Sequence, residues 1–108
     1  MYQLQSFPEL DSTNTYAHAH LGELADRTVV VAERQTAGRG QQGKCWLSNN
    51  TENIYLSIVL KPAVSPDSPL LVNLSQITGR IIADVLRSFC PEEAVTVKLP
   101  NDILINGK

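Results

Sequence analysis

The sequence predicts an α/β (α+β) fold, because segments of strand character and segments of helix character alternate along its 108 residues. Residues 28–32 (TVVVA) form a continuous β-branched run, which is typical of a strand buried on both faces. Apolar residues recur at three- and four-residue steps over residues 69–89, as they do on one face of a helix. The pair Asn106-Gly107 favours the tight turn of a β-hairpin.

A strand and a short helix are expected before that buried strand. The strand covers residues 2–7 and is closed by Pro8. Residues 11–14 (DSTN) are all good N-cap formers, so a helix should begin here. The apolar residues expected on this helix are Tyr16, Ala17, Leu21 and Leu24.

After the buried strand, residues 35–44 are predicted to form a glycine-rich loop, and residues 53–60 (NIYLSIVL) a second strand. Residues 61–69 are rich in proline and serine, and we interpret them as a connection within one domain of residues 1–108, since each side is too short to fold alone. The second strand should carry one apolar face, made of Ile54, Leu56, Ile58 and Leu60.

The long helix is predicted over residues 69–89. Asp67 or Ser68 can cap it, Pro69 suits its first position, and Pro91 should end it. Its expected apolar stripe consists of Leu70, Leu74, Ile77, Ile81, Val85 and Phe89.

Two short strands should follow the helix. Residues 94–99 alternate, so that Val95, Val97 and Leu99 point one way, and residues 103–105 form the other strand. A hairpin turn at residues 106–107 requires a returning strand, yet only Lys108 follows. The sequence therefore predicts a fragment with an unpaired sheet edge.

Composition narrows the class of protein. The net charge of −2 and the pI near 5.6 argue against a general binder of nucleic acid or anionic membranes. Cys45 and Cys90 lie far apart with no metal-ligand spacing, and no secretory signal or membrane span is visible. We expect a reduced, cytoplasmic protein.

The glycine-rich loop is the first candidate site. Residues 38–43 (GRGQQG) match the dinucleotide-binding pattern GxGxxG, but no helix is predicted after them, which argues against a dinucleotide fold. Arg34, Arg39 and Lys44 accompany the three glycines and favour a small anionic ligand such as a nucleotide. A solvated surface loop is the alternative that these residues leave open.

Three other motifs have a structural and a chemical interpretation. Residues 11–14 are either a plain helix cap or a set of hydrogen-bonding groups for a polar ligand. Residues 98–102 (KLPND) are either a turn or a phosphate and Mg²⁺ site. Trp46 either stacks on a ligand or anchors the core. His18 and His20 lie two apart on a helix and face different sides, so they form no metal pair.

The order of these motifs is more specific than any one of them. DSTN before a helix, ERQTAGRGQQGKCW after a buried strand, NIYLSIVLKP, a long helix and VKLPNDILINGK together resemble the biotin protein ligases (biotin–[acetyl-CoA-carboxylase] ligases) over nearly the whole chain. The resemblance implies a mixed sheet with flanking helices, similar to the class II tRNA-synthetase core. It also implies ATP-dependent formation of biotinyl-5′-AMP, with Mg²⁺, and transfer of biotin to a lysine of a biotin carboxyl carrier protein domain.

The resemblance also assigns roles to residues. Arg39 and Lys98 would be catalytic, and Asp102 would face Mg²⁺ bound to ATP. The biotin-binding residues would be Ser12, Thr13, Asn14, Gln35, Gly38, Arg39, Gly40 and Gln41. The ATP-binding residues would be Arg39, Trp46, Lys98, Asn101 and Asp102.

This sequence departs from the family pattern at three places. Gln41 stands where many members have a basic residue, which predicts weaker retention of the adenylate. Leu99 replaces the usual aromatic residue of K-W-P-N-D. The family's catalytic lysine begins a strand beyond Lys108, so the chain is expected to be the N-terminal part of the catalytic domain, with little or no activity alone.

No N-terminal helix-turn-helix precedes these motifs, so DNA is not an expected partner. A membrane is not expected either, because the apolar runs are too short to span one. A homodimer is possible. Two alternatives stay open. A lipoate or octanoate ligase shares the implied fold. A non-catalytic ligand-binding or assembly module would use the incomplete sheet edge to pair with another chain.

Overall fold

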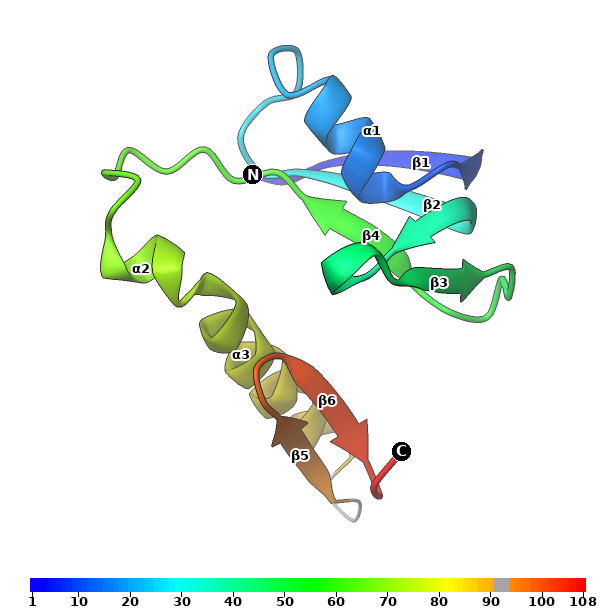
Figure 1. Cartoon of the computed structure of the whole chain (residues 1–108), viewed down its shortest axis with the longest axis vertical. Coiled ribbons are helices and arrows are strands. Elements are labelled where there is room, and N and C mark those ends of the chain that lie inside the picture. The colour runs from blue at the N-terminus through cyan, green and yellow to red at the C-terminus, as the bar shows by residue number, and fades with distance from the viewer. Residues whose placement is uncertain (91–93) are drawn as a thin grey trace. The chain divides into compact units, whose positions relative to one another are not determined.

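The computed structural model describes residues 1–90 and 94–108 and contains two compact units, Met1–Pro62 and Ala63–Lys108. We refer to them as the N-terminal and the C-terminal unit (Figure 1). Helices and strands alternate along the chain, so the predicted α/β class is confirmed. Within the described ranges, no helix combines the length and the apolar character needed to cross a membrane.

The N-terminal unit is built on a four-stranded mixed sheet. Its strands are β1 (Gln3–Leu10), β2 (Thr28–Arg39), β3 (Cys45–Ser48) and β4 (Tyr55–Ile58). The long strand β2 is central, because it pairs in parallel with β1 and antiparallel with both β3 and β4. The mixed sheet that the family resemblance implied is therefore present.

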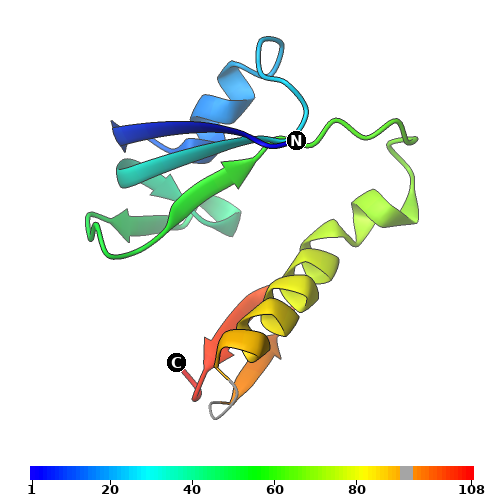
Figure 2. The same ribbon diagram turned by 180° about the vertical axis from the view of Figure 1, so that it is seen from behind.

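Helix α1 (Thr13–Ala19) lies on one face of this sheet, over β2 and β4 (Figures 1 and 2). The core between them is small and contains Ala17, Leu24, Val30 and Val59. Ser12 caps the helix, as its residue type predicted, and its hydroxyl accepts a hydrogen bond from Thr15 N at 3.3 Å.

Several predicted boundaries in this unit were wrong. Strand β1 continues past Pro8 to Leu10; Pro8 lacks an N–H, but β1 is an edge strand and needs no second partner. Helix α1 ends at Ala19, so Leu21 and Leu24 follow the helix instead of belonging to it.

The predicted loop over residues 35–44 was also wrong in its first half. Strand β2 runs through this segment to Arg39, and only a short 3-10 turn, η1 (Gln41–Gly43), separates it from β3. Only one face of β2 is fully buried: Thr28, Val30 and Ala32 are buried, whereas Val29 and Val31 are half-buried.

Strand β4 is shorter than predicted, and its apolar face is the exposed one. Ser57 is half-buried and Val59 is buried, on the side of the core. The four apolar residues do alternate along one face, as predicted, and all of them are exposed: Ile54, Leu56, Ile58 and Leu60. The strand faces the core with the opposite set of side chains because α1 contacts it through Thr13 and Ser57.

The C-terminal unit contains α2 (Pro69–Val72), α3 (Leu74–Phe89), β5 (Val95–Lys98) and β6 (Asp102–Ile105). The single long helix of the prediction is therefore interrupted at Asn73. Ser68 is the cap and Pro69 the first helical residue, as predicted. Helix α3 ends at Phe89, and Pro91, its expected terminator, lies outside the described residues.

The buried face of α3 is made of small residues. Gly79 and Ala83 are buried, and the hairpin β5–β6 packs beside the helix (Figure 2). The predicted apolar stripe does not coincide with this buried face: Leu70, which lies on α2, and Leu74, Ile81, Val85 and Phe89 are exposed, and Ile77 is half-buried. The hairpin backbone comes close to the helix at Gly79, where a Cβ would lie 3.5 Å from Asn101 Cα.

The C-terminal turn agrees with its prediction. Asn106 and Gly107 have φ values of 52° and 79°, and Lys108 N donates to Ile105 O at 3.2 Å. Both central residues are therefore left-handed, as a type I′ turn requires. The alternation of residues 94–99 is confirmed only over β5, because Leu99 lies beyond the strand and is exposed.

Candidate functional site

A β-bulge shapes the part of β2 that carries the predicted loop residues. Gln35 pairs with Ser48 and Gly38 pairs with Trp46, so three residue steps on β2 match two on β3. Within the bulge, Ala37 N donates to Asp11 O at 2.7 Å instead of to β3. The bulge thereby ties the end of β2 to the segment that opens α1.

A chain of hydrogen bonds crosses the unit at this point, and we call it the polar network. Thr13 Oγ1 and Ser57 Oγ lie 2.9 Å apart, and Thr13 N donates to Gln35 Oε1 at 2.8 Å. Gln35 Nε2 donates to Ser48 Oγ at 3.2 Å, and Ser48 Oγ donates to the carbonyl of Trp46 at 3.3 Å. Helix α1 and strands β2, β3 and β4 are therefore joined through polar side chains.

The polar network is protected from water. Thr13 and Ser48 are buried, with 4% and 2% of their surface exposed, and Gln35 is half-buried. Among the described residues, no buried side-chain nitrogen or oxygen lacks a hydrogen-bond partner. An arrangement in which every buried polar atom has at least one partner holds its members in fixed orientations.

Gly38 covers the polar network and leaves no space above it. A Cβ at this position would lie 2.6 Å from Ser48 Oγ, 2.9 Å from the Trp46 carbonyl oxygen and 3.1 Å from Gln35 Nε2. Glycine is required here because of this close approach. The site residues predicted on β2 are thus packed against one another.

An open cavity of about 360 Å³ lies beside α1. It brings together three of the predicted site residues, Ser12, Asn14 and Arg39. The guanidinium of Arg39 and the amide of Asn14 are exposed and can meet a carboxylate or phosphate there. The other lining residues are Thr15, His18 and Ala19.

The turn after Arg39 is closed by its own backbone. Gly40 N donates to Lys44 O at 2.7 Å, and Lys44 N donates to Gln41 O at 3.2 Å. The indole of Trp46 lies against Gly40, while 65% of Trp46 is exposed. The expectation that Trp46 anchors the core was therefore wrong, because its strand β3 is at the edge of the sheet.

Arg34 is separated from the other cations of the predicted loop. Its Nε lies 3.5 Å from Glu9 Oε2, across the β1–β2 pairing of Glu9 with Arg34. Arg39 is therefore the cation of this motif that faces the cavity.

The remaining predicted site residues lie in the C-terminal unit, on the β5–β6 hairpin. Lys98 and Asp102 are paired across the hairpin, and Lys98 Nζ lies 3.7 Å from Asp102 Oδ2. Asn101 lies in the connecting turn, where its backbone approaches Gly79 of α3. All three side chains are exposed, so they are free to meet a ligand from solvent.

No metal centre is preformed in the described part of the chain, since it holds no group of three or more His, Cys, Asp or Glu residues. His20 instead stacks on Tyr16, with ring centroids 4.2 Å apart. Cys45 and Cys90 are both free thiols.

Sequence reasoning missed four residues of the site. Ser48 and Ser57 belong to the polar network, and Thr15 and His18 line the cavity. The serines are found only once strand register is known, because they lie opposite residues of β2. For Thr15 and His18, the signal in the sequence was their position on the helix that DSTN caps.

The mixed sheet, the open cavity with Arg39 in its lining and the buried polar network together define an α/β domain. The model of the Biotin/lipoate A/B protein ligase family matches residues 6–108. The chain therefore belongs to this family.

Individual relatives agree with this membership. The chain is 37% identical over 101 residues to the bifunctional ligase/repressor BirA of Escherichia coli, covering 94% of this chain and 30% of that one. It is 33% identical to the biotin–[acetyl-CoA-carboxylase] ligase of Paracoccus denitrificans, covering 90% of this chain and 40% of the relative. The chain thus spans less than half the length of these curated relatives.

Solved structures give the same result. A biotin protein ligase from Aquifex aeolicus in complex with biotin and ATP matches with a TM-score of 0.79 and 29% identity, over 95% of this chain and 41% of that one. A biotin protein ligase from Leishmania major in complex with biotin matches with a TM-score of 0.81 and 25% identity, over 96% of this chain and 47% of that one.

Proposed function

We propose that residues 1–108 are the N-terminal portion of the catalytic domain of a biotin protein ligase. The whole enzyme would make biotinyl-5′-AMP from biotin and ATP and transfer biotin to a lysine of a biotin carboxyl carrier protein domain. The observation that carries the proposal is the cavity lined by Ser12, Asn14 and Arg39, next to the polar network. Family membership and the names of the relatives support it.

The N-terminal unit has groups suited to biotin. The ring system of biotin is a cyclic urea with N–H donors and a carbonyl acceptor, and its side chain ends in a carboxylate. Thr13 and Gln35 offer both donors and acceptors at fixed positions. Arg39 at the cavity supplies a positive charge for the carboxylate.

The first step joins two anions and therefore needs cations. The biotin carboxylate oxygen would attack the α-phosphorus of ATP, and pyrophosphate would leave with the electrons of the broken P–O bond. Arg39 would offset the charge that develops and hold the reactants in line. Lys98 would do the same for the phosphates. In the second step, the amine of the carrier lysine attacks the acyl carbon and AMP leaves.

ATP-bound Mg²⁺ fits the one carboxylate of the hairpin. Asp102 is exposed and its only charged partner among the described residues is Lys98 at 3.7 Å. Proteins hold Mg²⁺ mostly through one or two carboxylates together with substrate phosphates. Asp102, with the amide of Asn101 beside it, would hold the ion, whose chemistry is to neutralise phosphate charge.

Gln41 would make release of the adenylate easier. It lies in the exposed turn η1, directly after the Arg39-Gly40 pair. A neutral amide there gives less attraction for a phosphate than an arginine would. We expect Gln41→Arg to slow release of biotinyl-5′-AMP.

Biotin binding is the direct test, because the proposed biotin-binding residues all lie within residues 1–108. Calorimetric titration of the chain with biotin, alone and with ATP and Mg²⁺, should give saturable binding. Arg39→Ala should weaken this binding about tenfold or more. Arg34→Ala is the matched control: it removes the same charge five residues earlier, but Arg34 is paired with Glu9 and should leave affinity unchanged.

Two results would contradict the proposal. One is no biotin binding, even in a chain extended past Lys108. The other is equal affinity in Arg39→Ala and the unaltered chain. Transfer of biotin to a carrier domain should be weak at best, and strong transfer would contradict the view that 1–108 is only part of the catalytic domain.

A lipoate or octanoate ligase is the second candidate, since the family description includes lipoate ligases. Titration with lipoate in place of biotin separates the two. A non-catalytic assembly module is the third candidate. It predicts that the chain self-associates, which a size measurement in solution would detect.

The free thiols of Cys45 and Cys90 support a reducing, cytoplasmic location.

A further inference from the structure

The two ends of the polar network are backbone groups, and each can act in one sense only. Thr13 N–H can only donate, and it meets Gln35 Oε1 at 2.8 Å. The carbonyl of Trp46 can only accept, and it meets Ser48 Oγ at 3.3 Å. The direction of every hydrogen bond between these ends follows from them.

The Ser48 hydroxyl has a single proton, which it gives to the Trp46 carbonyl. Its oxygen is then left as an acceptor for Gln35 Nε2, at 3.2 Å. The amide of Gln35 therefore has its NH₂ end toward β3 and its carbonyl end toward α1. If the amide were reversed, Thr13 N–H would lose its acceptor, and two acceptors would compete for one hydroxyl proton.

This arrangement leaves some hydrogen-bonding groups of the Gln35 amide unused. One of its two N–H groups and one of its two carbonyl lone pairs are used within the network. One donor and one acceptor are left, and their positions are fixed by the used ones. Gln35 is half-buried, so the residue is not closed off from solvent.

Ser48 is well placed to impose this order. It is 2% exposed, and the Gly38 backbone covers its hydroxyl so closely that a Cβ there would lie 2.6 Å away. A water molecule has little room to replace the hydroxyl. We propose that Ser48 is a positioning residue: through its hydroxyl it fixes the amide orientation of Gln35, and so the donor and acceptor that Gln35 presents to a ligand.

A ligand-free measurement tests the positioning itself. The ¹⁵N-labelled side-chain NH₂ signals of Gln35, assigned by their loss in Gln35→Ala, are recorded in the full chain. Ser48→Ala should shift them and speed their exchange with solvent several-fold. Ser57→Ala is the matched control, because this serine contacts Thr13 and not Gln35. Unchanged Gln35 signals in Ser48→Ala, or equal changes in both variants, would overturn the proposal.

Biotin affinity tests the consequence, which rests on the proposed function. Ser48→Ala should weaken binding about tenfold, as loss of a supporting hydrogen bond to a ligand-contacting group does. In a Gln35→Ala background the same change should have no further effect, since Ser48 acts only through Gln35. If the affinity losses of Ser48→Ala and Gln35→Ala multiply in the double variant, the proposal is overturned. For Ser57→Ala and Gln35→Ala, the losses in affinity should multiply.

Ser48→Thr keeps the hydroxyl and should restore the Gln35 signals toward those of the unaltered chain; it also serves if Ser48→Ala fails to fold. A folded Ser48→Thr variant with Gln35 signals like those of unfolded glutamine would count against the proposal. If biotin fails to bind while the Gln35 signals respond to Ser48→Ala, the proposed function fails and the positioning role stands.

Discussion

The N-terminal and C-terminal units are held together by different kinds of contact. In the N-terminal unit, helix α1 meets the sheet through a small apolar core around Ala17 and through the polar network, in which Thr13 and Ser48 are almost completely enclosed. In the C-terminal unit, the buried residues of helix α3 are small, Gly79 and Ala83, and Gly79 lies close to the hairpin backbone at Asn101. The first unit is therefore sensitive to hydrogen-bond geometry and the second to side-chain volume.

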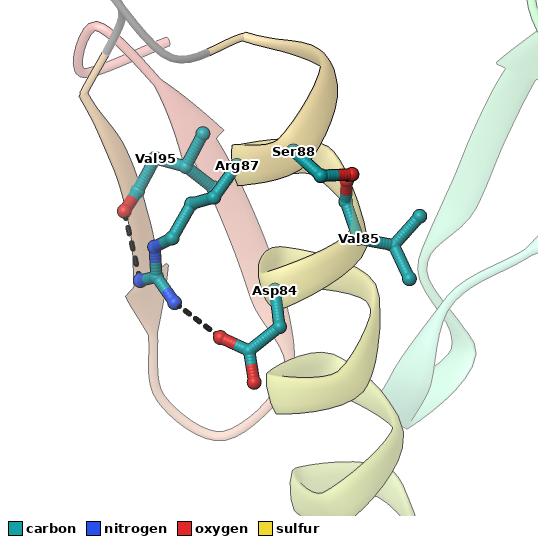
Figure 3. Close-up of polar contacts among 5 residues, drawn as sticks. All are labelled: Asp84, Val85, Arg87, Ser88 and Val95. Atoms are coloured by element: carbon teal, nitrogen blue, oxygen red, sulfur yellow. Dashed lines mark hydrogen bonds and ion pairs between the residues drawn. The ribbon is translucent and has the colours of Figure 1, made fainter.

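A clamp at the surface completes the C-terminal unit. Arg87 of α3 donates to the carbonyl of Val95 on β5 at 3.0 Å and to Asp84 at 2.7 Å (Figure 3). Near it, Ser88 Oγ donates to the carbonyl of Val85 at 2.6 Å within the same helix (Figure 3). The arginine side chain is 49% exposed, so solvent screens much of its ion pair.

The largest effect is expected at Gly38. Gly38→Ala would place a Cβ 2.6 Å from Ser48 Oγ and should destabilise the N-terminal unit by about 3 kcal/mol. Gly22→Ala is the control, because a Cβ there meets nothing within 4 Å. Hydrogen exchange of β2 amides measures the difference. Equal protection of the β2 amides from hydrogen exchange in the two variants would contradict the view that this unit depends on close polar packing.

Ala83 is the corresponding position in the C-terminal unit. Ala83 is 0% exposed, so Ala83→Leu should force α3 away from what it packs on and cost about 2 kcal/mol. The readout is hydrogen exchange of β5 amides. Val85→Leu, at a half-exposed site on the same helix, should be nearly neutral. A neutral Ala83→Leu would mean that helix and hairpin are not closely packed.

The helix caps sharpen the comparison further. Ser12 is buried and caps α1, whereas Ser68 is half-buried and caps the four-residue helix α2. Ser12→Ala should cost about 1 kcal/mol in urea unfolding, and Ser68→Ala about half of that. A reversed order would show that the cap at residue 12 is not supported by its surroundings.

The smallest effect is expected at the clamp. Arg87→Ala should cost about 0.5 kcal/mol, most of it from the hydrogen bond to Val95. Asp84→Asn keeps that bond and should cost less, while Arg80→Ala, at an exposed position of the same helix, controls for loss of charge. Thermal unfolding at low and high salt separates the two contributions, since salt screens only the ion pair.

The features that could be predicted from the sequence are those set by neighbouring residues, such as a helix cap and a turn. Ser12 as a cap and Asn106-Gly107 as a turn depend on neighbouring residues alone. The extension of β2 beyond Ala32 could not be predicted, because it depends on pairing with β1 as far as Gln35 and with β3 from Gln35 to Arg39. The buried face of α3 was also missed, since Gly79 and Ala83 carry no hydrophobic signal and are buried only because a hairpin lies near them.

The candidate site likewise contains residues that could be predicted from the sequence and residues that could not. Arg39 and Asn14 were proposed from motifs, and they do lie at one cavity. Ser48 was missed because its role depends on the register between β2 and β3, which places it opposite Gln35. The β-bulge beside this pair could not be predicted from the residue types. The roles of Lys98, Asn101 and Asp102 stay predictions that binding experiments have to test.

The polar network also sets an order of events during synthesis. The bond between Thr13 and Ser57 spans 44 positions of sequence. A ribosome delivers residues from the N-terminus onward, so α1 leaves it long before the strand that holds Ser57. Until then the hydroxyl of Thr13 must be satisfied by water. The polar network thus cannot be completed on a nascent chain with fewer than about sixty exposed residues, however early its first helix forms.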